Sequence, residues 1–444
     1  MDIVIRITQL ILSLSILVVI HEMGHFVFAK LFKTRVEKFY LFFDPWFSLF
    51  KYKKGDTEYG IGWLPLGGYV KISGMIDESM DKEAMKLPPQ PYEFRSKPTW
   101  QRLLIMIGGV LVNFLAAMLI FWLLLYAYGE QYIPVKNATY GLYYAPAGKE
   151  IGLKDGDIIL KVDTATIDVP GDITRHLLLS ESKTLTVKRG DSTFVIPIPI
   201  NFGKEKILGS GIKVFADIRL PFVVDSIIPD MPAAKAGFRK GDSLVAVNGK
   251  PASFFHQFAS LVGEQKGKSV SITVARGDSI VNLNCQVTDK GKVGIGNRDP
   301  SKYFTFKTIK YSFWEAFPAG VSKGVNVLVN YVKQLKLIFT KEGVTQIGGF
   351  GTMGSLFPTV WDWAAFWNLT ALISIILAFM NILPIPALDG GHVMFLLYEM
   401  ITGKKPGDKF LENAQIVGMV ILFSLLLYAN GNDVFKAIRH WFIK

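Results

Sequence analysis

Four long stretches of the chain carry almost no charge, and they set the predicted architecture. They run between residues 6 and 30, 102 and 130, 362 and 389, and 412 and 433. Each can cross a bilayer, because the hydrocarbon core requires about 20 helical residues. Glu22 is the only charge inside the first stretch, and no small-residue cleavage site follows it, so we predict a retained span rather than a signal peptide. The pattern predicts a polytopic α-helical membrane protein with four transmembrane helices.

The polar segment between the second and third stretches repeats itself. Residues 152–157 (GLKDGD) recur as residues 237–242 (GFRKGD), and residues 189–192 (RGDS) recur as residues 276–279. Both copies alternate short β-rich runs with Gly, Asp and Asn turns, which is typical of small antiparallel sheets. We therefore predict two copies of one β-rich domain, inserted between the second and third helices.

The two copies resemble PDZ domains, in which a tight Gly-Asp turn leads into a strand and then a hairpin. The second copy has the Asn248-Gly249 hairpin turn, whereas the first has Asp163-Thr164 at that place. The resemblance implies peptide-binding grooves, for which the second copy is the better match. A generic β-rich spacer is the alternative interpretation.

These patterns divide the chain into ten segments. The first five are transmembrane helix 1 (1–32), a cytoplasmic loop with a re-entrant β-hairpin (33–101), helix 2 (102–129), and the two PDZ-like domains (130–210 and 211–300). The others are an interfacial amphipathic segment (301–361), helix 3 with a broken end (362–392), a cytoplasmic loop (393–412), helix 4 (413–432) and a C-terminal tail (433–444). The amphipathic pattern is carried by Phe313, Trp314, Phe317, Val321 and Val325.

Composition agrees with a membrane protein and excludes other classes. Apolar residues make up 50% of the chain and charged residues 19%, and the mean hydropathy is +0.31. This balance excludes collagen-like, coiled-coil and disordered chains. The net charge of +12 comes from dispersed basic residues without a nucleic-acid-binding motif, so we predict no nucleic acid partner. The single cysteine, Cys285, excludes an intrachain disulfide and a cysteine-based zinc cluster.

The placement of basic residues predicts the orientation in the membrane, because short loops rich in Lys and Arg stay cytoplasmic. Such residues follow the first span and precede the fourth: Lys30, Lys33, Arg35, Lys38, Lys404, Lys405 and Lys409. Segments 33–101 and 393–412 are therefore predicted to be cytoplasmic, and the repeated domains to lie outside. The tail argues the other way, since Lys436, Arg439 and Lys444 outnumber Asp433.

The first span contains the motif His21-Glu22-Met23-Gly24-His25. Residues four apart share one helical face, so both imidazoles can touch one metal ion. Glu22 projects about 60° from His25, close enough to accept a proton from water without being a ligand. A carboxylate in hydrocarbon costs on the order of 3 kcal/mol, and such groups are usually functional. The motif predicts a metal site, the alternative being histidines packed on an apolar face.

A zinc site with an open position needs a third protein ligand, and Asp389 is the best candidate. It ends the third apolar stretch, where Pro384 and Pro386 stop the helix and free backbone groups that the protein must satisfy internally. The first and third spans reach similar depths at His21 and near residue 383, so the proline segment must turn back or run sideways. Asp44 and His392 are the other reachable candidates.

Two further features of the polar loop and the spans predict contacts near this site. Residues 57–63 and 69–73 are two short strands that flank a turn, and an edge strand there can pair with a substrate backbone. An ordinary surface hairpin is the alternative. Asn113 and Asn381 are polar groups within apolar spans, and each needs a hydrogen-bond partner. For Asn113 we expect only a role in joining helices.

The combination of motifs resembles the site-2 protease family of intramembrane zinc metalloproteases. The matching motifs are the HExxH of the first span, residues 67–71 (GGYVK) and the proline-rich segment 381–391, which contains Leu388-Asp389-Gly390. The resemblance covers nearly the whole chain and implies one Zn²⁺ held by His21, His25 and Asp389, with Glu22 as the base. It also implies that substrate contacts a set of residues in the hairpin and the third span: Gly67, Gly68, Tyr69, Val70, Asn381, Pro384 and Pro386.

The resemblance further implies an endopeptidase of the bacterial inner membrane that cuts single-span membrane proteins after a first extracytoplasmic cut. Its expected substrates are anti-sigma factors, as in a sigma-E stress response, or remnant signal peptides. The expected partners also include lipid and peptide ligands of the PDZ-like domains. The alternative function is a non-catalytic, zinc-containing scaffold that binds peptides through residues 211–296. Metal transport would require polar residues along more than one span, and these are lacking.

Overall fold

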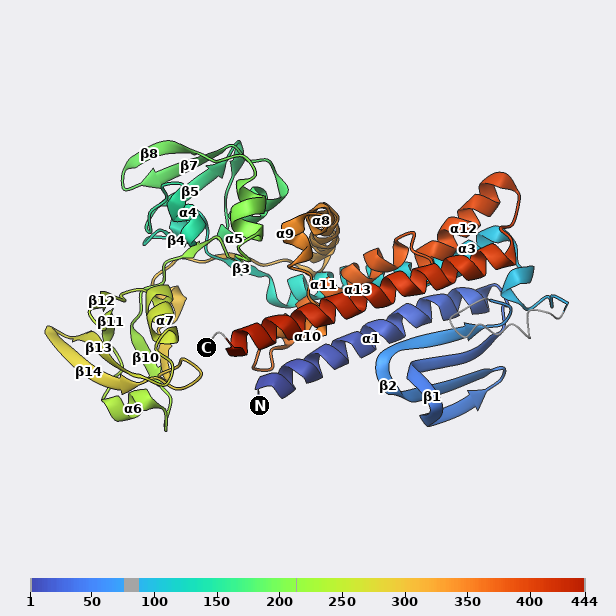
Figure 1. The fold of residues 1–444 in the computed structure, drawn as a ribbon, viewed down its shortest axis with the longest axis horizontal. Helices are drawn as coiled ribbons and strands as arrows, with labels where there is room; N and C mark the ends of the chain where they lie inside the picture. Colours follow the sequence, from blue (N-terminus) through green and yellow to red (C-terminus); the bar gives the residue numbers. More distant parts are fainter. Residues whose placement is uncertain (1, 76–87, 213, 443–444) are drawn as a thin grey trace. The chain divides into compact units, whose positions relative to one another are not determined.

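The computed structural model describes residues 2–75, 88–212 and 214–442. The chain forms two compact units, one of Met1–Gly129 with Lys310–Lys444 and one of Glu130–Ile309. Residues 76–87 of the predicted 33–101 loop, and the last two residues of the predicted tail, lie outside the described residues. The first unit is helical with one β-sheet, and the second is mostly β-structure (Figure 1).

Four helices of the first unit are long and apolar enough to cross a membrane. They are α1 (Asp2–Leu31), α3 (Thr99–Tyr128), α11 (Trp363–Ile382) and α13 (Asp408–Phe442). Helix α3 begins directly after Pro98 and ends at Gly129, whose φ of 66° only glycine adopts easily. Asp362 caps α11, since its carboxylate accepts a hydrogen bond from the Ala365 N–H. The protein is thus a multi-pass membrane protein with β-rich parts.

The helix of the third predicted span ends directly before Pro384, as the prolines predict. Leu383 leaves the helical region with ψ of 143°, because the residue before a proline is disfavoured in a helix. A new helix, α12 (Asp389–Thr402), then begins at Asp389 and ends at Gly403. The predicted cytoplasmic loop at 393–412 is therefore wrong over its first part, which is helical.

The predicted C-terminal tail is also wrong, because α13 runs on through Phe442. This helix has 35 residues, which corresponds to about 52 Å at 1.5 Å per residue and exceeds the bilayer core. The extension is held by polar side chains. The Asp433 carboxylate accepts hydrogen bonds from Gly349 N–H and Thr352 N–H, and the Asn432 amide donates to Ile347 O.

The segment predicted as interfacial and amphipathic contains three helices, α8 (Phe313–Ile338), α9 (Lys341–Val344) and α10 (Phe350–Leu356). Helix α8 packs against α3 through small residues one turn apart: Ala316, Gly320 and Gly324. A Cβ added at Gly320 would lie 2.6 Å from Trp122 N, so glycine permits this close approach. Two of the aromatic residues that suggested the amphipathic pattern, Phe313 and Phe317, contact the Trp122 ring of α3, whereas Trp314 is exposed.

The hairpin predicted within residues 33–101 is a larger sheet than the sequence predicts. Strands β1 (Val36–Lys54) and β2 (Thr57–Ile72) both bend, and residues 36–41 pair with residues 58–61 on one side and with residues 68–72 on the other. Residues 48–54 pair with the far side of 57–62. The two predicted strands therefore do not pair with each other, because 36–41 lies between them. Residues 68–72 form one edge of this sheet, beside α1.

The second unit contains two four-stranded sheets of the same strand order. The first, β6-β5-β7-β8, is formed by Ala165–Thr166, Ile158–Val162, Thr184–Arg189 and Ser192–Pro197. The second, β12-β11-β13-β14, is formed by Lys250–Pro251, Ser243–Val247, Ser269–Arg276 and Ser279–Gln286. One longer helix accompanies each sheet, α5 (Pro170–Leu179) in the first copy and α7 (Phe255–Gly263) in the second. The structure thus contains the repeat that the sequence predicts.

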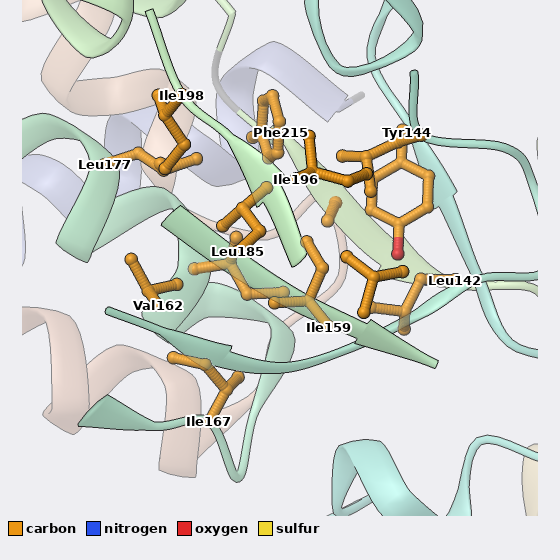
Figure 2. Packing of buried hydrophobic residues seen from close by; sticks show 14 of the residues in the cluster. Leu142, Tyr144, Ile159, Val162, Ile167, Leu177, Leu185, Ile196, Ile198 and Phe215 are labelled. Carbon is orange, nitrogen blue, oxygen red and sulfur yellow. The ribbon is translucent and has the colours of Figure 1, made fainter. Parts of the chain in front are cut away.

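Short elements complete this unit. Among the described residues, its remaining α-helices are α4 (Pro146–Glu150) and α6 (Pro232–Ala236). Three further strand pairs are β3 (Glu130–Tyr132) with β16 (Lys307–Ile309), β4 (Leu142–Tyr144) with β9 (Ala216–Ile218), and β10 (Val224–Ile227) with β15 (Ile295–Asn297). The β4–β9 pair moves the boundary between the copies. Phe215 lies in the apolar core of the first copy, beyond the predicted boundary at 210 (Figure 2). Ala216 belongs to the same core.

Equivalent hairpin turns are made with different residues. In the second copy, Asn248 and Gly249 have φ of 50° and 77°, and the Asn248 side chain accepts a hydrogen bond from Ser271 N–H. In the first copy, Asp163 has φ of 52°, and its carboxylate accepts from Lys183 N–H and Thr184 N–H. Asp and Asn both tolerate positive φ and bond to nearby backbone, so the substitution preserves the turn.

The repeated sequence motifs form the same ion pair in each copy. Arg189 donates two hydrogen bonds of 2.7 Å to Asp157, and Arg276 donates bonds of 2.7 and 2.8 Å to Asp242. Each arginine also donates to the backbone carbonyl that opens the Gly-Asp motif, Gly152 O or Gly237 O. Burial raises the pKa of Asp242, but the bonds from Arg276 and the Arg239 N–H outweigh it and hold that pKa below its ordinary value.

Arg276→Met removes the partner of a carboxylate that is wholly buried, so we expect the second copy to lose about 3 kcal/mol of stability. The measurement is hydrogen exchange of residues 222–299 in the full-length protein. A depressed carboxyl pKa stabilises the fold above the ordinary pKa of Asp and loses that effect as pH falls, so the difference from the native protein should shrink in acid. Lys240→Met, which removes an exposed pair with Asp225, is the control. Equal effects of the two substitutions would contradict this account.

Candidate metal centre

Helices α1 and α3 approach closely where three glycines meet. A Cβ added at Gly24 would lie 2.2 Å from the Gly108 carbonyl oxygen, and one added at Gly109 would lie 2.4 Å from His25 Nε2. No larger residue fits at these positions without movement of backbone or histidine. The absence of side chains on this part of α3 lets both histidines of α1 lie directly against it.

Three side chains from distant parts of the sequence converge at this crossing. His21 Nε2 lies 3.1 Å from Asp389 Oδ2, and His25 Nε2 lies 3.4 Å from the same oxygen. The two Nε2 atoms are 3.2 Å apart. His25 is buried, and the other two residues are largely so. The three side chains therefore present two nitrogens and one oxygen to a single point.

This donor set fits a zinc ion. Zinc prefers imidazole nitrogen and carboxylate oxygen at 2.0–2.2 Å, which places tetrahedral ligand atoms about 3.4 Å apart. The three observed separations lie between 3.1 and 3.4 Å. Asp389 Oδ2 is buried and has no hydrogen-bond partner among the described residues, as a ligand atom would. Three protein ligands leave a fourth position for a reactant, as catalytic zinc sites do.

The segment that delivers Asp389 is the broken end of the third span. Between α11 and α12 the chain turns sharply, with Ala387 at φ of 80°. Added Cβ atoms at Gly390 and Gly391 would lie 2.2 Å from Leu383 O and 2.7 Å from Ile385 O, so these glycines let α12 start against the break. The chain therefore turns after residue 383, which is how a residue six positions later reaches His21.

Glu22 lies on the side of α1 that faces the sheet. A Cβ added at Gly68 would lie 3.7 Å from Glu22 Cγ, and the backbone of Val70 interacts with the Glu22 carboxylate. The edge strand 68–72 thus runs past the HExxH motif of α1. The sequence predicts a substrate-pairing strand in this loop, but its position beside Glu22 depends on the tertiary structure.

One cavity of about 850 Å³ contains most of the predicted site residues. The predicted residues that line it are His21, Glu22, His25, Gly67, Gly68, Tyr69, Val70, Asn381 and Asp389. Pro384 and Pro386 are not among the described residues that line it. Pro386 instead packs against α13 at Gly418, and Pro384 is exposed, so their place is in shaping the break rather than the cavity wall.

The other predicted ligands have different surroundings. The Asp44 carboxylate accepts hydrogen bonds from Tyr69 Oη at 2.8 Å and Ser48 Oγ at 3.0 Å, which fixes the sheet. His392 lines the cavity outside the three-residue cluster. Asn381 Nδ2 lies 3.3 Å from His21 Nε2.

Asn113 is expected from the sequence only to join helices. Its Nδ2 atom lies 3.3 Å from His21 Nδ1, a contact that the sequence did not predict. The Ile105 carbonyl oxygen lies 2.8 Å from His25 Nδ1. Because this is a backbone contact, no residue type in the sequence could have indicated it.

The comparisons with known proteins agree with this class of site. The model of peptidase family M50, the site-2 proteases, matches residues 9–425, so the chain belongs to that family. The protein is a zinc-dependent metalloprotease of the site-2 type, which favours the predicted enzyme over the scaffold.

Three relatives align over nearly their full lengths. The chain is 27% identical to the "Putative zinc metalloprotease" of Treponema pallidum, over 96% of this chain and 97% of the relative. It is 27% identical to a protein of the same name from Vibrio cholerae, over 97% and 99%. It is also 27% identical to the "Regulator of sigma-E protease RseP" of Escherichia coli, over 95% and 97%.

Gly109→Ala should reduce bound zinc and abolish proteolysis, although alanine is the better helix former by about 1 kcal/mol. The added methyl group would occupy space now filled by both imidazoles. Zinc content per protein, measured by atomic absorption after purification, tests this expectation. Gly431→Ala in α13 is the matched control, because nothing lies within 4 Å of its added Cβ. A Gly109→Ala protein with full zinc content and activity would show that the close crossing is not required.

Proposed function

We propose that this protein is an intramembrane endopeptidase that cuts transmembrane segments of single-span membrane proteins. The observation that carries the proposal is the convergence of His21, His25 and Asp389 inside the membrane unit, with Glu22 beside them. Neither a surface protease nor a structural zinc site requires a carboxylate base at that depth. The proposal assigns the three converging residues as zinc ligands and Glu22 as the general base.

The chain's own residues divide the chemistry among them. When bound, zinc supplies Lewis acidity that polarises the scissile carbonyl and activates water near neutral pH. Glu22 accepts the proton of the attacking water and returns it to the leaving amine. Asn381, with its amide 3.3 Å from His21 Nε2, is placed to donate a hydrogen bond to the substrate carbonyl oxygen. The surrounding apolar helices exclude bulk water, which strengthens these electrostatic interactions.

Substrate binding is assigned to the edge strand of the sheet. A transmembrane helix must unwind before its peptide bonds can be cut, and the freed N–H and C=O groups need partners within the membrane. An edge strand offers such partners through β-augmentation. Residues 68–72 form an edge and pass Glu22, so a substrate strand added there would lie along the catalytic motif. Gly67, Gly68, Tyr69 and Val70 are the proposed contacts.

The far part of the same sheet supports insertion into the membrane surface. Four large apolar side chains there are exposed, namely Trp46, Phe47, Leu49 and Phe50. Lys51, Lys53 and Lys54 follow directly. Aromatic and basic residues of this kind are typical of the bilayer interface. The proposal therefore places this sheet at the cytoplasmic face of a bacterial inner membrane.

The second unit is proposed to be a pair of periplasmic PDZ-like domains that select substrates. Both copies have a four-stranded sheet and a longer helix, and PDZ domains bind an extended peptide as a strand added to a sheet edge. A unit of this size would obstruct substrates with bulky outer domains, so a first cut outside would precede cleavage. Anti-sigma factors and remnant signal peptides are the proposed substrate classes. The name of the relative from Escherichia coli, a regulator of sigma-E, supports the first class.

Glu22→Gln should keep zinc and stop cleavage, whereas Asp389→Asn should lose zinc, because only the second substitution weakens a proposed ligand. The loss of the base should cost at least about 100-fold in kcat. The test measures zinc content and cleavage of a reconstituted single-span substrate, with and without chelator. Unchanged turnover by the Glu22→Gln variant would reject its role as base, and full zinc occupancy in the Asp389→Asn variant would reject that ligand.

Replacing Glu130–Ile309 by a flexible linker should permit cleavage of substrates that retain their outer domain. The physical reason is that the second unit forms its own compact body, so its removal leaves the membrane unit's internal contacts intact. Cleavage of trimmed and untrimmed substrate is compared for the full chain and the shortened chain. Cleavage of trimmed substrate alone by both proteins would contradict a filtering role.

A further inference from the structure

We propose that Asn113 is a positioning residue for His21: its side-chain oxygen accepts the His21 Nδ1–H and thereby presents the Nε2 lone pair to the metal. This inference rests on the proposed ligand set. It concerns α3, the helix that faces the proposed ligands. It assigns the Asn113 side chain a role other than joining helices.

The His21 ring must carry its proton on Nδ1 if Nε2 is to bind a metal. Nε2 is the nitrogen that faces the cluster, 3.1 Å from Asp389 Oδ2 and 3.2 Å from His25 Nε2. A neutral imidazole has one N–H and one lone pair, so Nδ1 must then be the donor. The group next to His21 Nδ1 must accordingly be an acceptor.

The Asn113 carboxamide can be that acceptor. One of its terminal atoms lies 3.3 Å from His21 Nδ1, and this atom is assigned as Nδ2. The other, Oδ1, is buried and has no hydrogen-bond partner among the described residues. The oxygen and nitrogen of an amide are interchangeable by a half-turn, and the hydrogen-bond network decides between them. Only the turned orientation is compatible with metal binding through His21 Nε2.

His25 provides the internal comparison, because its partner admits no such choice. Its Nδ1 lies 2.8 Å from the Ile105 carbonyl oxygen, which can only accept. His25 therefore carries its proton on Nδ1 and directs Nε2 to the cluster. With Asn113 as acceptor, both histidines bond to α3 through Nδ1 and face the metal through Nε2, the arrangement that metal-binding histidines usually have.

Helix geometry explains how one helix serves both rings. The histidines are four residues apart, about 6 Å along α1, whereas residues 105 and 113 are eight apart, about 12 Å along α3. A helical carbonyl points towards the C-terminus and a side chain leans towards the N-terminus, so these two groups approach each other from either side of Gly109. Because α3 runs antiparallel to α1, residue 105 meets His25 and residue 113 meets His21.

The backbone of residue 113 already performs the structural task. Ser374 Oγ of α11 donates a hydrogen bond of 2.7 Å to the Asn113 carbonyl oxygen, and both residues are buried. Any residue at position 113 would supply that carbonyl. The side chain is therefore free of the helix-joining role, and its one contact of this kind among the described residues is with His21.

The test compares zinc dissociation constants, measured by chelator competition, for Asn113→Leu, Asn113→Asp and Ser374→Ala in the full-length protein. Removing the partner of a ligating histidine weakens metal binding by about 10- to 100-fold, so Asn113→Leu should show this loss. Asn113→Asp keeps an acceptor oxygen and loses the donor, so it should remain within about threefold of the native protein. Ser374→Ala removes only the helix contact and should bind zinc normally. Visible spectra of the cobalt-substituted proteins report the coordination geometry independently of activity.

Native affinity in the Asn113→Leu variant would overturn the inference, as would an equal loss in Ser374→Ala. If Asn113→Asp binds as weakly as Asn113→Leu, the proposed orientation of the amide is wrong. His21→Ala separates this inference from the proposed function. If that substitution leaves zinc affinity unchanged, the ligand set itself fails and this inference fails with it. If it abolishes binding while Asn113→Leu does not, the ligand set stands and only the positioning role is lost.

Discussion

The close approach of α1 and α3 is the constraint on which the rest of the membrane unit depends. Gly24 and Gly108 bring the two backbones together, and Gly109 leaves the room that the imidazoles fill. Lipid offers no hydrophobic drive for helices to associate, so contacts of this kind and interhelical hydrogen bonds hold the bundle together. The same contact lets the Ile105 carbonyl reach a ring nitrogen of His25. The close approach of α1 and α3 therefore accounts both for the packing of these two helices and for the orientation of the His25 ring.

Polar groups at membrane depth require partners inside the protein, and this requirement links the distant segments. Asp389 is brought to the histidines by a break in the third span, which exposes backbone groups that a continuous helix would satisfy. Gly390 and Gly418 let α12 and α13 pack directly on the broken segment. The break thus brings Asp389 to the two histidines, and its residues Ala387 and Leu388 line the cavity beside them.

The second unit is stabilised differently from the membrane unit, because polar groups at the surface of its sheets can bind water. Each copy places an arginine against a buried aspartate at the same point of the same sheet. The residues that recur in both copies are those of this ion pair and its turn. The apolar core residues differ more between the two copies. Asp163 of the first copy occupies the position of Asn248 in the second. The residue types differ, but both residues have the positive φ that the turn requires.

The sequence by itself determined the four spans, the repeat and the motif formed by His21, Glu22 and His25, because each depends on local periodicity or spacing. It also pointed to Asp389, since prolines that stop a helix act locally. Tertiary structure alone decided that residues 36–41 separate the two predicted strands, that α13 continues past residue 433, and that Asn113 contacts His21. These features depend on which segment lies beside which. A pairing between residues far apart in the sequence produces no periodic pattern along it. A contact made by a backbone carbonyl, such as that of Ile105, does not depend on residue type and so cannot be predicted from the sequence.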